Sequence, residues 1–478
     1  MLIRPASPAT EDGLMSMVSP RPAAFARVAI VLFAGPLSGC KRHSPAPAPV
    51  PSVVAPAVPS ADDASASDPA VPAQCRALAG FGLTLDAAPT PAAKAAPEGT
   101  EDEDDDALLP FGVDIGEAVP TSRGFALAGI RGAGQAFVAR LSDHGGQRID
   151  LGELHGDAET PALAPLGDDV LIALRGTDAA GFTVKLGRIA GADGNAVEWG
   201  FELSKLGKSV TGVQLAASGA RAVLVYQSEE KQGASQLMLG TFATSALKEP
   251  FQVKPLDAKD AEMPRLTTRP GGYWLSWVRT LPEPKKAGKK PDATEAAQDP
   301  EERELLDVGL RVVEVAKLDE QAKPVGAPLR IGEPRRQVLL YDAAPLASGG
   351  LLIAARSDSA TPGAEGGALV LSEVGADGSV REERLEDDEI GAGAPALLVD
   401  GDPKLPGPWL AMSSPSDATR LGLARGGQTV LQADALLGHG EVLAVSAGHF
   451  LVQRARGRSV TLEALDCSWP SEPAAEKK

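Results

Sequence analysis

The chain has 478 residues and a formal net charge of −18, with 52 glycines and 40 prolines, about a fifth of the whole. That glycine and proline content excludes a mostly helical protein, and the acidic balance argues against general nucleic-acid binding, which needs Lys and Arg to neutralise phosphates. Aromatic residues make up only 4% of the chain, so any core has to be built from Val, Leu, Ile and Ala.

The N-terminal region is predicted to be an export signal. An arginine precedes the uncharged apolar stretch 28–37, which is too short to cross a hydrocarbon core about 30 Å thick. It leads into Leu37-Ser38-Gly39-Cys40, which resembles the lipobox of bacterial lipoproteins. That resemblance implies that residues 1–39 are a signal peptide and that Cys40 carries acyl chains such as palmitate. An ordinary secretory signal with an incidental cysteine is the alternative.

Two segments are expected to be disordered before the first packed domain. Residues 40–74 are rich in Pro, Ala and Ser, a composition typical of an extended tether. Within the lipoprotein resemblance, Lys41 directly after the modified cysteine favours the outer membrane. Residues 86–110 include the acidic run 101–106, which we interpret as a solvated linker, because a calcium site also needs fixed geometry and other oxygens. The tail 469–478 is also predicted to be disordered.

Beyond residue 110 the chain repeats one pattern seven times. Each copy has a short apolar segment, a glycine-containing turn and two further apolar strands, as in 135–142, and a more polar fourth strand such as 147–154 closes all but the seventh copy. The second strands should begin near Phe125, Val170, Ala222, Tyr273, Leu351, Trp409 and Phe450. This repeat predicts an all-β fold, a β-propeller of seven four-stranded blades over 111–468. A β-sandwich pair or another strand-rich array is the alternative.

Two of the predicted hairpin turns carry Asp-Gly, namely Asp193-Gly194 and Asp377-Gly378. This dipeptide between apolar runs favours a type I′ turn, because both central positions then have positive φ.

The seventh copy lacks a fourth strand, since the chain turns polar soon after the strands 450–455 and 459–467. The orphan apolar segment 75–85 is expected to supply that strand, which resembles the "velcro" closure of the β-propeller superfamily. If the segment pairs antiparallel with 459–467, Cys75 and Cys467 come within the Cα separation of about 4.4–6.8 Å that a disulfide requires. An exported protein meets an oxidising compartment where such bridges persist. Two unrelated buried thiols are the alternative.

Few residues suggest a cofactor or metal site, and we predict none of either. The glycine-rich string 129–134 is flanked by strands, so it is interpreted as a hairpin turn and not as a phosphate loop. His439 and His449 could approach each other across neighbouring strands as a zinc pair, against the alternative of ordinary turn histidines.

Three arginines are the candidates for an enzyme site. Arg175, Arg279 and Arg356 end the second strand of three copies at matching positions. Repetition of one residue type at one register more often reflects shared ancestry of the copies, so no catalytic residue is assigned. Trp274 and Trp277 are three apart in a strand and therefore face opposite sides. One is expected in the core, and the other could line a surface groove.

The fourth copy contains a charged insertion, 282–304. Its four lysines, Lys285, Lys286, Lys289 and Lys290, form a basic patch that could touch anionic lipid or an acidic partner. An inert loop is the alternative.

Together these features predict a lipid-anchored, extracytoplasmic β-propeller at the bacterial cell envelope, expected in the outer membrane. Its expected role is binding or scaffolding, with a protein or polysaccharide partner at one face and no nucleic acid. The competing hypothesis is an extracytoplasmic hydrolase or lyase with a site at the mouth of the central channel. A tight cluster of carboxylate, His and Arg at that mouth favours the enzyme, and a broad polar surface favours the binding module.

Overall fold

The computed structural model describes residues 74–86, 112–132, 134–154, 158–207, 209–231, 234–281, 310–332, 336–359, 368–386, 393–400, 407–413, 418–424, 429, 431–456 and 458–468. All of them belong to one compact unit, Ser67–Lys478. Cys40 and the signal peptide lie outside the described residues, as do nearly all of the tether and of the acidic linker, the insertion with its four lysines, and the tail.

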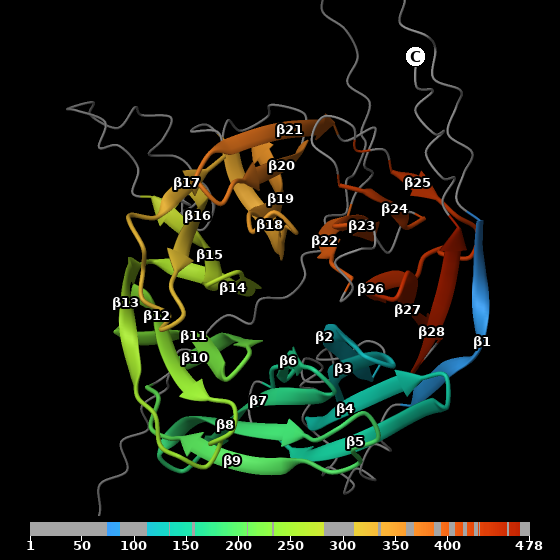
Figure 1. The fold of residues 1–478 in the computed structure, drawn as a ribbon, viewed down its shortest axis with the longest axis horizontal. Helices are drawn as coiled ribbons and strands as arrows, with labels where there is room; N and C mark the ends of the chain where they lie inside the picture. The colour runs from blue at the N-terminus through green and yellow to red at the C-terminus, as the bar shows by residue number, and fades with distance from the viewer. Residues whose placement is uncertain are drawn as a thin grey trace, which may run out of the picture. The chain divides into compact units, whose positions relative to one another are not determined.

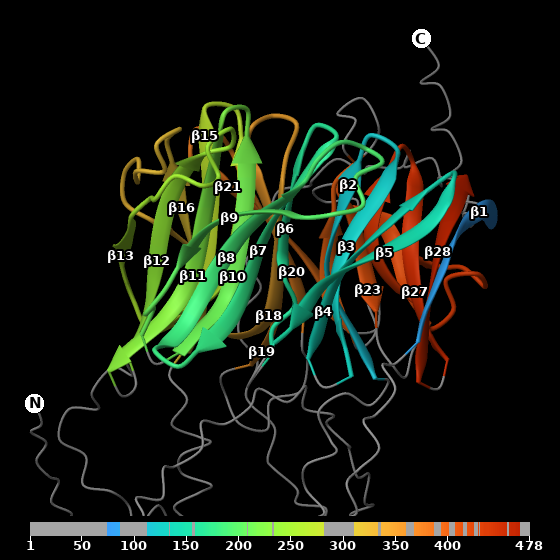
Figure 2. The same ribbon diagram turned by 90° about the horizontal axis from the view of Figure 1, so that it is seen from below.

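Seven antiparallel sheets of four strands each form a ring. Figure 1 looks down the ring, with one strand of every sheet near its centre, and Figure 2 shows the strands running from one face of the ring to the other. The predicted seven-bladed β-propeller is therefore confirmed. Within the described residues, no helix is long and apolar enough to cross a membrane.

The strands follow one another in chain order from the ring's centre outward, except for β1. Blade 1 contains β2 (Val113–Thr121), β3 (Gly124–Arg131), β4 (Gln135–Ser142) and β5 (Gly145–Glu153). Blade 2 contains β6 (Ala162–Leu166), β7 (Asp169–Asp178), β8 (Gly181–Ile189) and β9 (Glu198–Leu203). Blade 3 contains β10 (Ser209–Ser218), β11 (Arg221–Lys231), β12 (Ala234–Ala243) and β13 (Val253–Lys259). Blade 4 contains β14 (Ala261–Arg269), β15 (Gly272–Leu281), β16 (Leu310–Leu318) and β17 (Leu329–Ile331).

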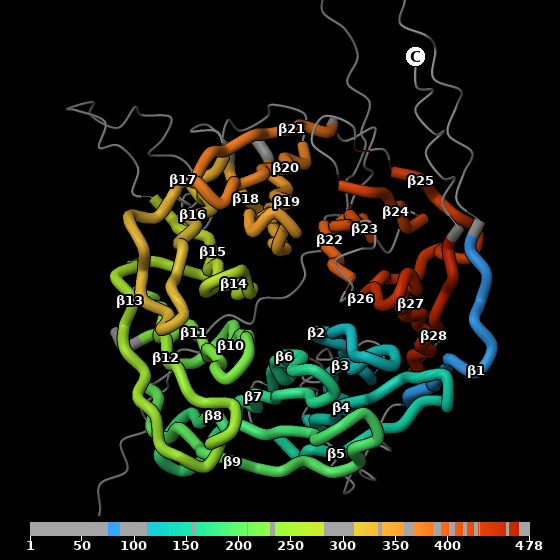
Figure 3. Tube along the Cα trace, in the orientation of Figure 1, coloured from blue at the N-terminus to red at the C-terminus, as the bar shows by residue number. Residues whose placement is uncertain are grey.

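The remaining blades continue the same order, which the tube in Figure 3 follows around the ring. Blade 5 contains β18 (Arg336–Pro345), β19 (Leu351–Ser359), β20 (Ala368–Val374) and β21 (Val380–Glu386). Blade 6 contains β22 (Ala394–Leu398), β23 (Trp409–Ser413), β24 (Arg420–Leu423) and β25 (Gln432–Ala433). Blade 7 contains β26 (Glu441–Ser446), β27 (His449–Arg456), β28 (Ser459–Ser468) and the N-terminal strand β1 (Gln74–Asp86).

The seven second strands begin within one residue of their predicted starts. In blade 1, β3 and β4 are buried over most of their length, whereas the first strand β2 is half-buried and the fourth strand β5 is largely exposed. We call the side that carries the connections from first to second and from third to fourth strands the turn face. The opposite side, with the connections from second to third strands and from blade to blade, is the loop face.

The type I′ prediction for the two Asp-Gly turns is wrong. Neither Asp193 nor Asp377 has a positive φ, and of the two glycines only Gly378 does, at 89°. The β20–β21 connection is longer than the two residues of a type I′ turn, so a left-handed residue is needed only at its end. Asp377 Oδ1 instead accepts a hydrogen bond from Ser379 N at 2.9 Å.

The core lies between the blades. Each pair of neighbouring blades shares one large apolar cluster, such as the one that holds Leu171 of β7 and Tyr226 of β11. Trp274 and Trp277 face opposite sides of β15 as predicted, yet both are buried, in two successive clusters. Trp274 Nε1 also donates to Gly349 O at 3.1 Å. Neither tryptophan lines a surface groove, so that hypothesis is wrong.

The ring closes as predicted, with β1 as the outer strand of blade 7 beside β28. The two strands pair antiparallel, from Gln74 opposite Ser468 to Asp86 opposite Ser459. Their register shifts between Ala77 and Gly82, which the sequence pattern did not indicate. Gln74 therefore enters the ring at the turn face, where the chain also leaves β28.

Candidate functional site

The innermost strands of five blades are interrupted at comparable positions. Pairing with the second strand shifts register within β2, β10, β14, β18 and β26. A bulge leaves residues unpaired and re-aims nearby side chains. In three of these strands a charged residue lies at or just after the shift, namely Glu117, Arg265 and Asp342. Charged side chains are thereby gathered around the axis of the ring.

Carboxylates near the axis join three of the blades to the next one. Three of them accept a hydrogen bond from a backbone N–H in the first strand of the following blade. The pairs are Glu117 Oε2 with Leu163 N (3.1 Å), Glu159 Oε1 with Gly212 N (2.7 Å) and Asp342 Oδ2 with Leu397 N (2.8 Å). These bonds link blades 1 to 2, 2 to 3 and 5 to 6, so the carboxylates have a structural role.

Two arginines complete this group, which we call the axial cluster: Glu117, Glu159, Arg175, Arg265 and Asp342. Arg265 Nε donates to Asp342 Oδ1 at 3.3 Å, which links blade 4 to blade 5. Arg175 Nε lies 3.6 Å from Glu159 Oε2. The Arg265 side chain keeps 36% of its surface accessible although blades surround it, so solvent reaches this part of the axis.

Burial and charge shift the protonation of the axial cluster. Burial raises the pKa of Glu117 from 4.5 to about 7, against the opposing effects of the Leu163 N–H and of Arg265. Burial also raises the pKa of Glu159, although Arg175 opposes that shift. For Arg265, burial disfavours the charged form, but the negative charges of Asp342 and Glu117 outweigh it and the pKa is raised. Near neutral pH, Glu117 therefore exchanges a proton beside a permanently charged guanidinium.

This arrangement supplies a titrating carboxyl next to an ion pair, which is suited to general acid–base work. It holds no histidine. In the described part of the chain, no group of three or more His, Cys, Asp or Glu side chains could hold a metal ion. Two shallow cavities lie between blades 4 and 5 and between blades 5 and 6, lined by residues other than those of the axial cluster.

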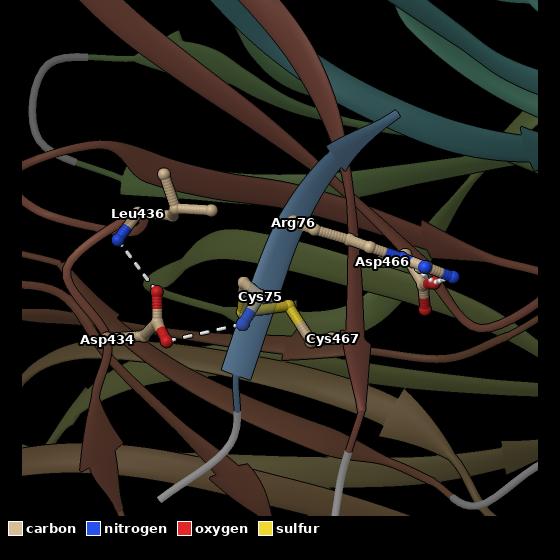
Figure 4. The surroundings of a disulfide bond; sticks show 6 residues. All are labelled: Cys75, Arg76, Asp434, Leu436, Asp466 and Cys467. Carbon is tan, nitrogen blue, oxygen red and sulfur yellow. Dashed lines mark hydrogen bonds and ion pairs between the residues drawn. A yellow bond between two sulfur atoms is a disulfide. The ribbon is translucent and has the colours of Figure 1, made fainter. Parts of the chain in front are cut away.

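The second cluster is at the rim, where β1 closes the ring, and we call it the latch: Cys75, Arg76, Asp434, Asp466 and Cys467 (Figure 4). Cys75 and Cys467 are joined as a disulfide pair with their Cα atoms 4.0 Å apart, closer than expected. Cys75 directs its N–H away from β28, to Asp434 Oδ2 at 3.3 Å. That direction is typical of a non-hydrogen-bonded pair, whose Cα atoms approach to about 4.5 Å.

The three candidate arginines do not converge on one site. Arg175 Nη1 donates to Val210 O in the next blade. Arg356 Nη1 donates to Gly393 O at 3.1 Å, at the entry to blade 6. Arg279 Nη1 instead bonds within its own blade, to Glu314 Oε1 at 3.2 Å. These contacts hold strands and blades together, and only Arg175 belongs to the axial cluster.

The zinc-pair hypothesis for the last blade is wrong. His439 precedes β26 at the loop face, whereas His449 begins β27 at the turn face. The length of a six-residue strand, about 20 Å, separates those two ends. The His449 ring instead lies with its centroid 6.4 Å from that of Phe81 in β1.

Sequence reasoning missed most of the axial cluster. Glu117 and Arg265 lie at the start of two of the expected copies, and Asp342 lies just before a third, in first strands that also hold other charged residues such as Asp114 and Arg269. A charge inside a buried strand requires a partner, and that is the signal that could have found them.

No protein-family model matches this chain, and no curated protein matches its sequence. Several solved structures share the fold. YCF48 bound to a D1 peptide is 12% identical with a TM-score of 0.43, and the match covers 77% of this chain and 95% of that one. The β-propeller domain of the Trilobed protease from Pyrococcus furiosus, described as having an open velcro topology, is 10% identical with a TM-score of 0.42, covering 75% and 96%.

An enzyme is also among these structures. The α-L-arabinanase of Penicillium chrysogenum complexed with arabinobiose is 12% identical with a TM-score of 0.38, and the match covers 62% of this chain and 90% of that one. Identities this low show the fold alone.

Proposed function

We propose that this protein is a binding module, a rigid ring anchored to the bacterial outer membrane through acyl chains on Cys40. Its partner is a protein or polysaccharide of the cell envelope, bound at the loop face. One observation carries the proposal: the N-terminal strand enters the ring at the turn face, and the two longest connections, 87–112 and 282–309, belong to the opposite face.

This polarity suits an anchored module. Long connections on a rigid scaffold are where binding residues concentrate. An extended polyproline segment rises about 3.1 Å per residue, so a tether over 40–73 reaches about 100 Å from the bilayer. The ring can then present its loop face to a partner while the turn face carries the attachment.

Photo-crosslinking tests which face binds. Ala179, in the β7–β8 turn of the loop face, and Ala220, in the β10–β11 turn of the turn face, are both exposed alanines. Each is replaced by benzoylphenylalanine, and the protein is illuminated in its own membranes. We expect a cross-linked envelope component from Ala179 and none from Ala220. A product from Ala220 alone, or none from either position, contradicts binding at the loop face.

The anchor has a separate test. Cys40→Ala removes the thiol that the lipobox resemblance marks for acylation, so we expect loss of palmitate labelling and release from the membrane fraction. Cys75→Ser is the matched control, since that cysteine lies in β1 within the ring, and its labelling should stay at the wild-type level. Undiminished labelling of the Cys40→Ala protein contradicts the lipoprotein assignment.

A hydrolase or lyase is the second candidate, and the axial cluster is the observation that favours it. Glu117, with its raised pKa, would be the proton donor, and Asp342, held by Arg265, would be the second acidic group. A panel of 4-nitrophenyl glycosides and esters tests this. Turnover by the wild type that is lost in Glu117→Gln supports an enzyme, and equal rates for the two proteins contradict it.

A further inference from the structure

The disulfide lies where the N-terminal segment joins the ring. Cys75 is the second residue of β1, so only Gln74 precedes it in the strand. A pulling force on the chain before residue 74 is therefore applied to the folded domain at Gln74, directly next to Cys75. Through the Cys75 sulfur it reaches Cys467, which is 7% exposed and packs in the apolar cluster between blades 6 and 7.

Without the disulfide, little would hold this end of β1. The shift between Ala77 and Gly82 divides the strand, so its first segment pairs with β28 over only four residues, Gln74 to Ala77. The ion pair between Arg76 and Asp466 is exposed, with 80% of the Arg76 side chain accessible, and such pairs contribute little. The bond from Cys75 N to Asp434 is a single hydrogen bond at 3.3 Å.

The rest of β1 covers the apolar contact between blades 7 and 1, on which closure of the ring depends. Leu85 is 1% exposed and lies in the cluster shared by blades 7 and 1, with Leu78 and Leu83 packed against it. A Cβ placed on Gly146 of blade 1 would lie 2.7 Å from that of Leu83, so β1 also closely contacts blade 1. Peeling β1 away would therefore expose apolar surface of both blades.

We propose that the Cys75–Cys467 disulfide is a tension-bearing latch. It transmits force from the N-terminal segment directly into β28, so that β1 is not peeled from blade 7. In the cell this role rests on the proposed lipid anchor, since a ring that is anchored at one face and bound at the other carries load when the membrane and the partner are drawn apart. The mechanical property itself belongs to the ring.

Optical-trap pulling on residues 41–478, which retain the whole ring, tests the latch. One handle is attached before Lys41 and the other at an azide-bearing residue in place of the exposed Ala179 on the loop face. In the Cys75→Ser/Cys467→Ser protein we expect an additional early step at lower force. That step releases the 38 residues from Cys75 to Gly112, a contour gain of roughly 130 Å. The oxidised wild type should lack it.

Two controls separate the possible explanations. Arg76→Ala keeps the disulfide and should retain the wild-type first rupture force. Reducing the folded wild type in the trap should produce the additional step even if the serine variant fails to fold. The same first rupture force and extension in oxidised and reduced wild type would overturn the proposal. Failure of the lipid anchor would appear separately, as undiminished palmitate labelling of Cys40→Ala.

Discussion

The latch and the axial cluster both hold the ring together, but with different chemistry. The latch joins two strands of one blade at the rim through a cysteine pair and an exposed ion pair. The axial cluster joins blade to blade at the centre, through carboxylates whose partners are backbone N–H groups. A cross-link acts mainly on the unfolded chain, whereas the carboxylates satisfy polar groups of the folded state. The two regions should therefore respond independently to mutation.

The largest effect is expected at the latch. Replacing both cysteines, in Cys75→Ser/Cys467→Ser, removes a cross-link between residues 392 apart. The unfolded chain gains entropy, so the free energy of unfolding should fall by about 2–4 kcal/mol. Guanidinium unfolding without reductant measures this. The reduced wild type is the matched control and should unfold like the variant, and equal midpoints for oxidised wild type and variant would contradict the prediction.

A smaller loss is expected when the axial cluster is broken. Asp342→Ala removes both the acceptor for Leu397 N and the partner of Arg265. Because Arg265 stays partly solvated, the loss should be about 1–3 kcal/mol of unfolding free energy. Asp342→Asn keeps an oxygen that can accept the Leu397 N–H and should lose less. If the two variants are equally stable, the backbone bond does not contribute as described.

The axial cluster should also make stability depend on pH. The folded-state pKa of Glu117 is about 7, raised from 4.5. Between these values the unfolded chain binds fewer protons than the folded one, so this contribution is present below pH 4.5 and is lost as pH rises to 7. Because the side chain is only half-buried, solvent screening limits the change to about 1–2 kcal/mol.

Glu117→Gln isolates that effect. The amide oxygen can still accept the Leu163 N–H, but the side chain no longer titrates. Denaturant unfolding at pH 5 and pH 8 should show a smaller difference for the variant than for the wild type, with Cys75→Ser/Cys467→Ser retaining the wild-type difference. An unchanged difference in Glu117→Gln would assign the pH dependence to other groups.

The repeat and its closure could be predicted because their signals are local. Leu351 and Trp409 each begin an apolar run after a glycine-containing turn or loop, and the structure starts β19 and β23 at those residues. The orphan segment at Cys75 was recognisable because one copy lacked a strand. The alternation of apolar residues and the composition of the turns depend on neighbours within one blade. The strands of each blade could therefore be predicted from the sequence.

The axial cluster could not be predicted from the sequence in the same way. Glu117 and Leu163 are 46 residues apart and meet only because successive blades pack side by side. Bulges in the first strands then re-aim the charged side chains, and nothing in the apolar pattern indicates where a bulge falls. The matching positions of Arg175, Arg279 and Arg356 suggested a common site. In the structure Arg175 and Arg356 instead donate hydrogen bonds to the next blade, and Arg279 donates one within its own blade.

The smallest effect should come from the charged part of the latch, which sharpens the contrast between the two regions. Arg76→Ala removes Nε and Nη2 contacts to Asp466 Oδ2, the first at 2.8 Å, but the arginine is mostly in solvent. Exposed ion pairs contribute about 0–1 kcal/mol and weaken with salt, so the unfolding midpoint should barely move and should move less in 1 M NaCl. Asp342→Ala, measured in parallel, should keep most of its loss in salt because its backbone hydrogen bond is not screened. A loss for Arg76→Ala as large as that for Asp342→Ala would mean that charge, and not the cross-link, holds β1 in place.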